Sequence, residues 1–470
     1  MVFGNNRVHE ATALRPLAGK RILINPLGSK PSLRGQNEEN VLVSLVRSRS
    51  GIMTTCLPPE LGTPSWFTAD GHRRWLFAEE DRLMRFHESP VRSRSFGISP
   101  LDAAGAPDNQ ANRELYATAR LVHCFSLEAM LGRPGAAARA GHAISVVNAF
   151  KDPDRPGWFS VFSAEGALVD DTKSAYAHAF VLLAAVSALQ AGLSEAQALW
   201  TDAVSALDDL FWDQRAGAVV DTTTAEGQLV EPNYRGQNAN MHLTEAYMAA
   251  FELTGDEKFQ RRAESISDLI INRSGREWSW RVPEHFDQNW AVVPDFNSDK
   301  PDDPFRPFGS LVGHWFEWAR LLVQLDALPG SRVPWATAAA KNLFSAGVTE
   351  GWDAAHGGVV YSVDFDGTPV NRSRMHWAIA EGIGASVYLG RLTGEPSYEA
   401  WYRMFWDQVA VDMIDLKGGS WWHEVDESGT PASTTWAGKP DLYHALQATL
   451  YLRADPRFGL AAAAHRGLIR

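Results

Sequence analysis

The stretch GWFSVFSAEGALVD at residues 157–170 is decisive for the fold, because variants of it recur along the chain. Each copy has a Gly entry, a short alternating strand, an acidic residue near a Gly and a second short strand, which is typical of a β-hairpin. The other copies are GAVVDTTTAEGQLV (217–230), GGVVYSVDFDGTPV (357–370) and GGSWWHEVDESGTPA (418–432). The copies therefore mark a repeating unit of roughly 60–70 residues, with one copy missing from the long middle gap.

Helical stretches lie between these hairpins, with apolar residues at spacings of three and four. They cover residues 112–131, 172–191, 239–254, 258–272, 310–327, 376–393 and 440–452. The runs Leu253–Asp256 and Leu392–Glu395 each end a helix with a Gly and begin the next with an acidic residue. Two helices per unit and about six units predict an all-α (α/α)6 barrel with short β-hairpin loops at its rim. An open solenoid of the same units is the alternative.

Composition excludes several classes of protein. The 470 residues carry a net charge of −12, which argues against a nucleic-acid partner. Two Cys predict a reduced, cytoplasmic protein, and the chain contains no apolar run long enough to cross a membrane. The 18 Trp are in excess, and none lies in residues 1–52. That basic segment lacks a helical period, so we expect a disordered N-terminal extension at 1–52 and a single catalytic domain at 53–470.

Several polar residues stand inside otherwise apolar helical stretches. They are His178, His242, His314, His444 and Arg120. Inner helices of a barrel would direct such side chains into one cavity, where titratable groups with shifted pKa values gather at active sites. Glu317, three residues after His314, shares its helix face and is expected to orient its imidazole.

Other chemistries find less support in the residues. His314 and Glu317 could bind a metal, but no HExxH, CxxC or dense carboxylate set accompanies them, so no metal is expected. Nucleotide-binding and nucleophilic-serine motifs are missing, so no cofactor is implied. Paired carboxylates, with Glu317, Glu381 and Asp441 as candidates, would suit glycoside hydrolysis.

The sequence resembles the N-acylglucosamine 2-epimerase family, specifically its aldose–ketose isomerase branch. The resemblance lies in YRGQNANMHLTEAY (234–247), FRPFGSLVGHWFEWARLL (305–322), GGSWWHEVD (418–426) and KPDLYHALQ (439–447), and it spans about residues 65–455. It implies an (α/α)6 barrel, a monosaccharide substrate and no cofactor.

The resemblance also implies roles for particular residues. His314 and His444 correspond to the acid/base pair, and Glu317 supports the site beside His314. The matched positions at the substrate are Arg120, Tyr176, Asn238, His242, Trp377, Glu381 and Trp436. The chemistry would be a histidine-mediated 1,2-proton transfer through a cis-enediol.

The expected reaction is D-mannose to D-fructose, with D-lyxose to D-xylulose as a related conversion. Positions that hold a sulfonate in some relatives are Pro304, His423 and Pro440 here, and proline donates no hydrogen bond. A sugar 2-epimerase acting on mannose or cellobiose remains the main alternative. Less favoured are a sulfoquinovose isomerase, a glycoside hydrolase and a non-catalytic sugar-binding toroid.

Overall fold

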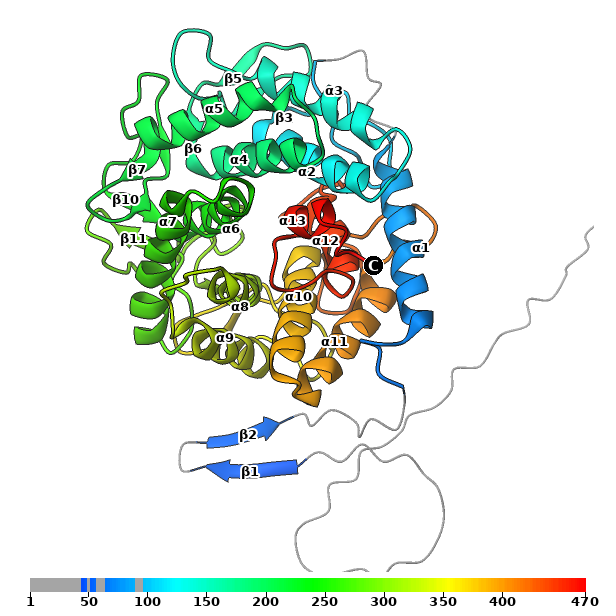
Figure 1. Cartoon of the computed structure of the whole chain (residues 1–470). Helices are drawn as coiled ribbons and strands as arrows, with labels where there is room; N and C mark the ends of the chain where they lie inside the picture. Colours follow the sequence, from blue (N-terminus) through cyan, green and yellow to red (C-terminus); the bar gives the residue numbers. More distant parts are fainter. Residues whose placement is uncertain (1–43, 49–50, 56–63, 89–95) are drawn as a thin grey trace, which may run out of the picture. The chain divides into compact units, whose positions relative to one another are not determined.

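All seven helical stretches expected from the sequence form helices. The computed structural model describes residues 44–48, 51–55, 64–88 and 96–470. From residue 64 onward, helices form two concentric rings (Figure 1). The predicted (α/α)6 barrel is confirmed.

Six helices form the inner ring. Each packs on the next, and α12 packs on α2 to close the circle, which an open solenoid would not do. These helices are α2 (Leu115–Met130), α4 (Ala175–Gln190), α6 (Gln237–Thr254), α8 (Val312–Ala327), α10 (His376–Thr393) and α12 (Tyr443–Tyr451). Because both sides of an inner helix face other helices, most of its residues are buried.

The outer ring supplies one partner for each inner helix. Its members are α1 (Asp70–His87), α3 (Ala136–Ala149), α5 (Ala196–Ala206), α7 (Glu257–Ser267), α9 (Ala336–Glu350) and α11 (Pro396–Gln408). Helices α5, α7 and α11 each continue into a π-helical turn, at Leu207–Phe211, Asp268–Gly275 and Val409–Met413. Helix α1 packs on α12, so the first described helix completes the last pair.

Short antiparallel strands join neighbouring units at one end of the ring. The strand in front of an inner helix pairs with a hairpin strand in front of the next inner helix. The sets are β3 (Arg113–Glu114) with β4 (Val161–Phe162) and β5 (Leu168–Asp170); β6 (Lys173–Ser174) with β9 (Thr222–Thr223); β10 (Tyr234–Gly236) with β11 (His285–Asp287); β12 (Ser310–Leu311) with β13 (Ser362–Val363) and β14 (Pro369–Asn371); and β15 (Arg374–Met375) with β16 (Glu424–Val425). Strands β7 (Trp212–Asp213) and β8 (Ala218–Val219) form a further pair. These strands hold the N-terminal ends of the inner helices together.

The four predicted hairpin turns are present at the rim. Each ends in a Gly with positive φ, a conformation that suits Gly because it lacks a Cβ: Gly166, Gly227, Gly367 and Gly429. Two further turns of the same kind, at 102–105 and 287–290, were not predicted. In the second, Trp290 takes the Gly position at φ 63°, which hides the turn from a search for Gly.

The opposite end of the ring is closed by the C-terminal segment. Helix α13 (Leu460–His465) packs against α2, α4 and α6. Nδ1 of His465 lies 2.8 Å from the carbonyl of Gln190, the last residue of α4. The toroid is therefore a cup that opens at the hairpin rim.

The expected N-terminal extension lies mostly outside the described residues. Within it, strands β1 (Ser44–Ser48) and β2 (Gly51–Thr55) pair with each other, and the expected boundary at residue 52 falls inside β2. The division at that residue stays a prediction. None of the helices described is both long and apolar enough to cross a membrane.

Candidate active site

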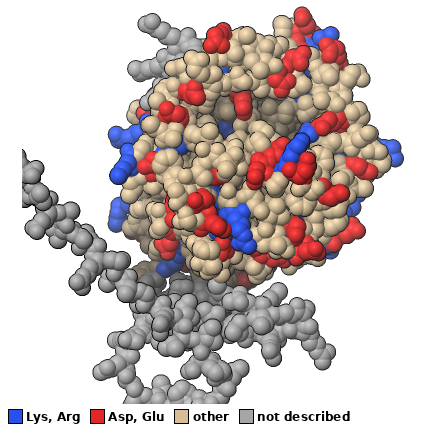
Figure 2. Space-filling view, turned by 180° about the vertical axis from the view of Figure 1, so that it is seen from behind, with Lys and Arg blue, Asp and Glu red and all other residues tan. Residues whose placement is uncertain are grey.

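The rim end of the ring contains a pocket of about 890 Å³, its mouth included. Nine of the ten predicted site residues line it; the exception is Glu381. The face opposite to that of Figure 1 is hollowed near its upper centre, and Asp and Glu are more prominent than Lys and Arg on it (Figure 2). This face is thus mostly uncharged, and its charged side chains are mainly acidic.

Equivalent positions on the inner helices supply the lining. Second residues of these helices are Tyr176, Asn238, Trp377 and His444, and sixth residues are Arg120, His242 and Glu317. Positions four apart lie on one helix face, so Asn238 and His242 of α6 line the cavity at two levels. On α8 the second residue is Gly313, where a Cβ would lie 2.3 Å from the Trp377 ring.

His314 is held by a carboxylate from a rim loop. Its Nδ1 lies 2.9 and 3.0 Å from the two oxygens of Glu284, and Gln237 Nε2 donates to the same carboxylate at 2.8 Å. The amide nitrogen of Gln237 also lies 2.8 Å from Nδ1 of His314. A carboxylate only accepts, and a bare Nδ1 would set its lone pair against both oxygens of Glu284, so Nδ1 carries the proton and the Gln237 amide donates to Glu284. Nε2 of His314 is left for the pocket. Glu317 was expected in this role; the structure places Glu284 there instead.

His444 is held in the same way, by a carboxylate on the neighbouring inner helix α10. Its Nδ1 lies 3.1 Å from Oε1 of Glu381, whose Oε2 accepts from Nε of Arg320 at 2.8 Å. Burial lowers the pKa of His444, which keeps the imidazole neutral. The expectation that Glu381 contacts substrate is therefore corrected: this residue lies behind His444 and is fully buried.

Arg120 crosses the upper part of the pocket. It donates to the hydroxyl of Tyr176 at 2.8 Å and pairs with Asp441 at 3.4 Å. Burial alone would raise the pKa of Asp441, but Arg120 and His376 hold it well below its usual range. Arg120 is thus a fixed cation beside a fixed anion. The sequence suggested Asp441 only as a candidate for glycoside hydrolysis.

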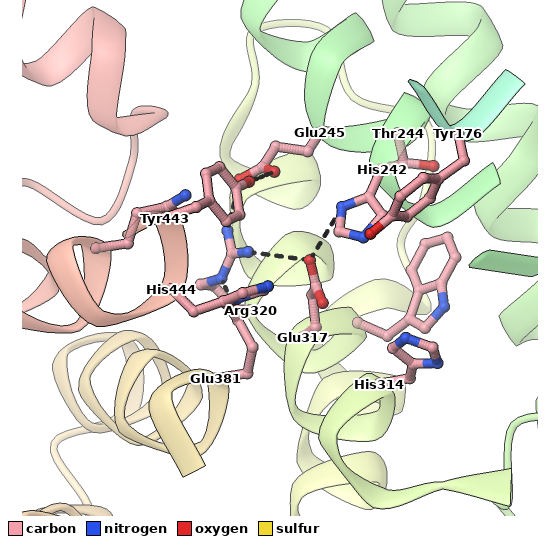
Figure 3. Close-up of polar contacts among 12 residues, drawn as sticks. Tyr176, His242, Thr244, Glu245, His314, Glu317, Arg320, Glu381, Tyr443 and His444 are labelled. Atoms are coloured by element: carbon pink, nitrogen blue, oxygen red, sulfur yellow. Dashed lines mark hydrogen bonds and ion pairs between the residues drawn. The ribbon is translucent and has the colours of Figure 1, made fainter. Parts of the chain in front are cut away.

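His242 and Glu317 meet at the floor of the pocket (Figure 3). Nδ1 of His242 lies 3.5 Å from Oε1 of Glu317. With Glu245 they form a set of possible metal ligands, all within 4.8 Å of one another. Arg320 pairs with both carboxylates, at 3.2 Å to Glu245 and 3.6 Å to Glu317, so a cation already lies against this set.

Two tryptophans and the two prolines form much of the remaining wall. The Trp377 ring lies between the two histidines, with centroids 5.0 Å from His314 and 6.0 Å from His444. Trp436, Pro304, Pro440 and His423 also line the cavity, as do Tyr176 and Asn238. Flat apolar rings and prolines suit the C–H faces of a sugar.

His178 does not reach this pocket. Its Nε2 accepts from the backbone N–H of Trp158 at 3.1 Å, and its Nδ1 lies 2.7 Å from the carbonyl of Ser174. Both ring nitrogens thus serve the packing of a rim loop on α4.

Known proteins resemble this chain over most of its length. The family model for N-acylglucosamine 2-epimerase (GlcNAc 2-epimerase) matches residues 97–448. D-mannose isomerase from Thermobifida fusca is 42% identical over 387 residues, which cover 82% of this chain and 95% of that protein. D-mannose isomerase from Pseudomonas cannabina pv. alisalensis is 40% identical over 392 residues, covering 82% and 94%. A crystal structure of D-mannose isomerase superposes with a TM-score of 0.75 at 28% identity, covering 83% of this chain and 98% of that one. The chain therefore belongs to the N-acylglucosamine 2-epimerase family, as its sequence predicted.

Proposed function

We propose that this protein is an aldose–ketose isomerase that converts D-mannose to D-fructose. The observation that carries the proposal is its 42% identity to a D-mannose isomerase over 95% of that protein's length. The pocket geometry supports the same chemistry, because it brings two imidazoles together with Nδ1 of each held by a carboxylate.

The sugar ring opens first, and the C2 proton of the open-chain aldehyde is then removed, a step that we assign to His444. A neutral imidazole with Nδ1–H held by Glu381 has its Nε2 lone pair available for the pocket. His444 then returns the proton to C1. The C2 hydroxyl loses its proton and the C1 oxygen gains one, which gives the 2-ketose. His314, with Nε2 also free, assists opening of the sugar ring by moving a proton at the ring oxygens.

The intermediate is a cis-enediol whose developing negative charge needs a fixed counter-charge. Arg120 provides it, since a guanidinium stays protonated and the aromatic ring of Phe180 packs 4.3 Å from its centre. No step of this sequence requires a metal or a nucleotide.

The walls favour an uncharged sugar. Pro304 and Pro440 donate no hydrogen bonds, and Asp441 adds an anion to the lining. A sulfonate at the sugar's end would therefore find little to bind. D-Lyxose, which lacks the sixth carbon, is expected to be isomerised to D-xylulose.

Incubation with D-mannose in heavy water, followed by NMR, tests the proposal. We expect D-fructose carrying deuterium at C1. D-Glucose as the main product would indicate a 2-epimerase instead, because the proton would have returned to C2. Faster conversion of sulfoquinovose than of mannose would contradict the uncharged substrate. Sugar binding with neither a new sugar nor deuterium exchange would contradict isomerisation.

A further inference from the structure

One cation at the floor of the pocket faces three carboxylates. The guanidinium of Arg320 lies 2.8 Å from Glu381, 3.2 Å from Glu245 and 3.6 Å from Glu317 (Figure 3). Arg320 is almost fully buried, and so are Glu317 and Glu381. Three ionised carboxylates on one guanidinium would leave two uncompensated charges in a site with little water, which is costly.

Hydrogen bonds distinguish Glu381 and Glu245 from Glu317. Glu381 accepts from Nε of Arg320 at 2.8 Å and lies 3.1 Å from Nδ1 of His444. Glu245 accepts from Nη1 of Arg320 at 3.2 Å and from the hydroxyl of Tyr443. Donors such as these stabilise the charged form.

Glu317 differs from both. Neither of its oxygens has a hydrogen-bond donor among the residues that the structure describes, although both oxygens are buried. Its ion-pair contacts are longer than hydrogen bonds, with Nδ1 of His242 at 3.5 Å and Nη2 of Arg320 at 3.6 Å. Arginine has no hydrogen-bond acceptor, so of these two neighbours only His242 can accept a hydrogen bond from a protonated Glu317.

We propose that Glu317 is a protonated carboxylic acid that donates to Nδ1 of His242, and that it thereby holds His242 in the tautomer with its proton on Nε2. The separation of 3.5 Å shortens to a hydrogen bond when substrate fills the pocket, as catalytic contacts commonly do. Burial and the neighbouring Glu381 raise the pKa of Glu317 well above its ordinary value. Burial and the nearby Arg120 lower that of His242.

The three imidazoles of the pocket would then present two different groups to the substrate. His314 and His444 place Nδ1–H on a carboxylate and keep a basic Nε2 for the pocket. His242 has the opposite arrangement and presents an N–H. Such a neutral donor can hydrogen-bond an oxygen of the enediolate without competing for the C2 proton. This use of the donor rests on the proposed function, whereas the protonation of Glu317 does not.

Infrared spectroscopy of the substrate-free protein tests the protonation directly. Glu128 and Glu252 have pKa values raised to about 7, so spectra are recorded at about pH 9, where they are ionised. We expect a carboxylic-acid C=O band that is lost in Glu317→Gln and kept in Glu252→Gln, the control at a glutamate outside this cluster. A band that survives Glu317→Gln, or the absence of any band, would overturn the proposal.

NMR of protein with ¹⁵N-labelled histidine gives a second readout that needs no Glu317 variant. The His242 signals are those missing in His242→Gln. We expect Nε2 protonated and Nδ1 bare; Nδ1 protonated would overturn the proposal, as would a stoichiometric metal ion on His242 in the purified protein. Neither measurement involves turnover, so failure of mannose isomerisation is a separate result.

Discussion

Glu284 and His314 form a buried carboxylate–imidazole pair, with Nδ1 of the histidine 2.9 Å from Oε1 of the glutamate. The two residues are 30 positions apart, one in a rim loop and one in the first turn of α8. The same carboxylate accepts from the backbone N–H of Leu311 at 3.2 Å. Glu284 therefore fixes both the tautomer of His314 and the start of its helix.

The first prediction concerns this pair. Glu284→Gln should lower kcat for D-mannose by about 100-fold, because a neutral amide that can also donate replaces the anion that keeps the proton of His314 on Nδ1. Steady-state kinetics checks this, with KM expected to change less than kcat. Glu277→Gln, at an exposed position, is the matched control. Unaltered kcat in Glu284→Gln would mean that His314 does not need this partner.

The second prediction separates the two histidines. His444→Ala and His314→Ala should each reduce turnover at least about 100-fold, the lower range for loss of a general acid or base. Deuterium exchange at C2 of mannose should be lost in His444→Ala. His356→Ala, at a side chain that is 57% exposed, should behave like the wild type. Near-normal turnover in either site variant would remove that residue from the acid/base pair.

The helices that could be predicted are those with a strong apolar pattern. Six of the seven expected stretches are inner helices, which are buried on both sides. Outer helices such as α3 and α9 are rich in Ala and expose one face, so their apolar pattern is weak. The missed turn at 287–290 lacks the Gly that marked the others, because Trp290 occupies its left-handed position.

The site residues also differ in how well the sequence predicts them. Residues that face the cavity, such as His314 and His444, stand out in apolar helices and match the family's motifs. Their carboxylate partners come from distant parts of the chain, and no local spacing links Glu284 to His314 or Glu381 to His444. Arg320 was missed although a signal existed: it lies three residues after Glu317, on the same helix face.

The third prediction follows from the lowered pKa of His444. The base must be neutral, so activity should fall only when pH drops through that pKa, below the ordinary histidine value of about 6.5. Profiles of kcat/KM against pH test this. Glu381 raises the pKa of His444, so Glu381→Gln should move the acid limb to still lower pH while reducing kcat. An acid limb above about pH 7 would contradict the assignment of His444 as the base.

The last prediction concerns stability and uses a histidine outside the pocket. Burial lowers the pKa of His178 to about 4, and its ring is bonded as the neutral form between Trp158 and Ser174. Below about pH 6.5 the unfolded chain binds a proton that the folded protein does not, so stability falls as pH decreases from about 6.5 towards 4, by up to about 1.4 kcal/mol per pH unit for this residue.

His178→Gln should be less stable than wild type at pH 8 by about 1–3 kcal/mol, since the Trp158 N–H loses its acceptor. The same variant should lose less stability on acidification. Chemical denaturation at both ends of this range measures the two effects, with the exposed His356→Gln as control. An equal pH dependence in His178→Gln and wild type would show that His178 takes up its proton without unfolding, and that the neutral form is not what holds the rim loop on α4.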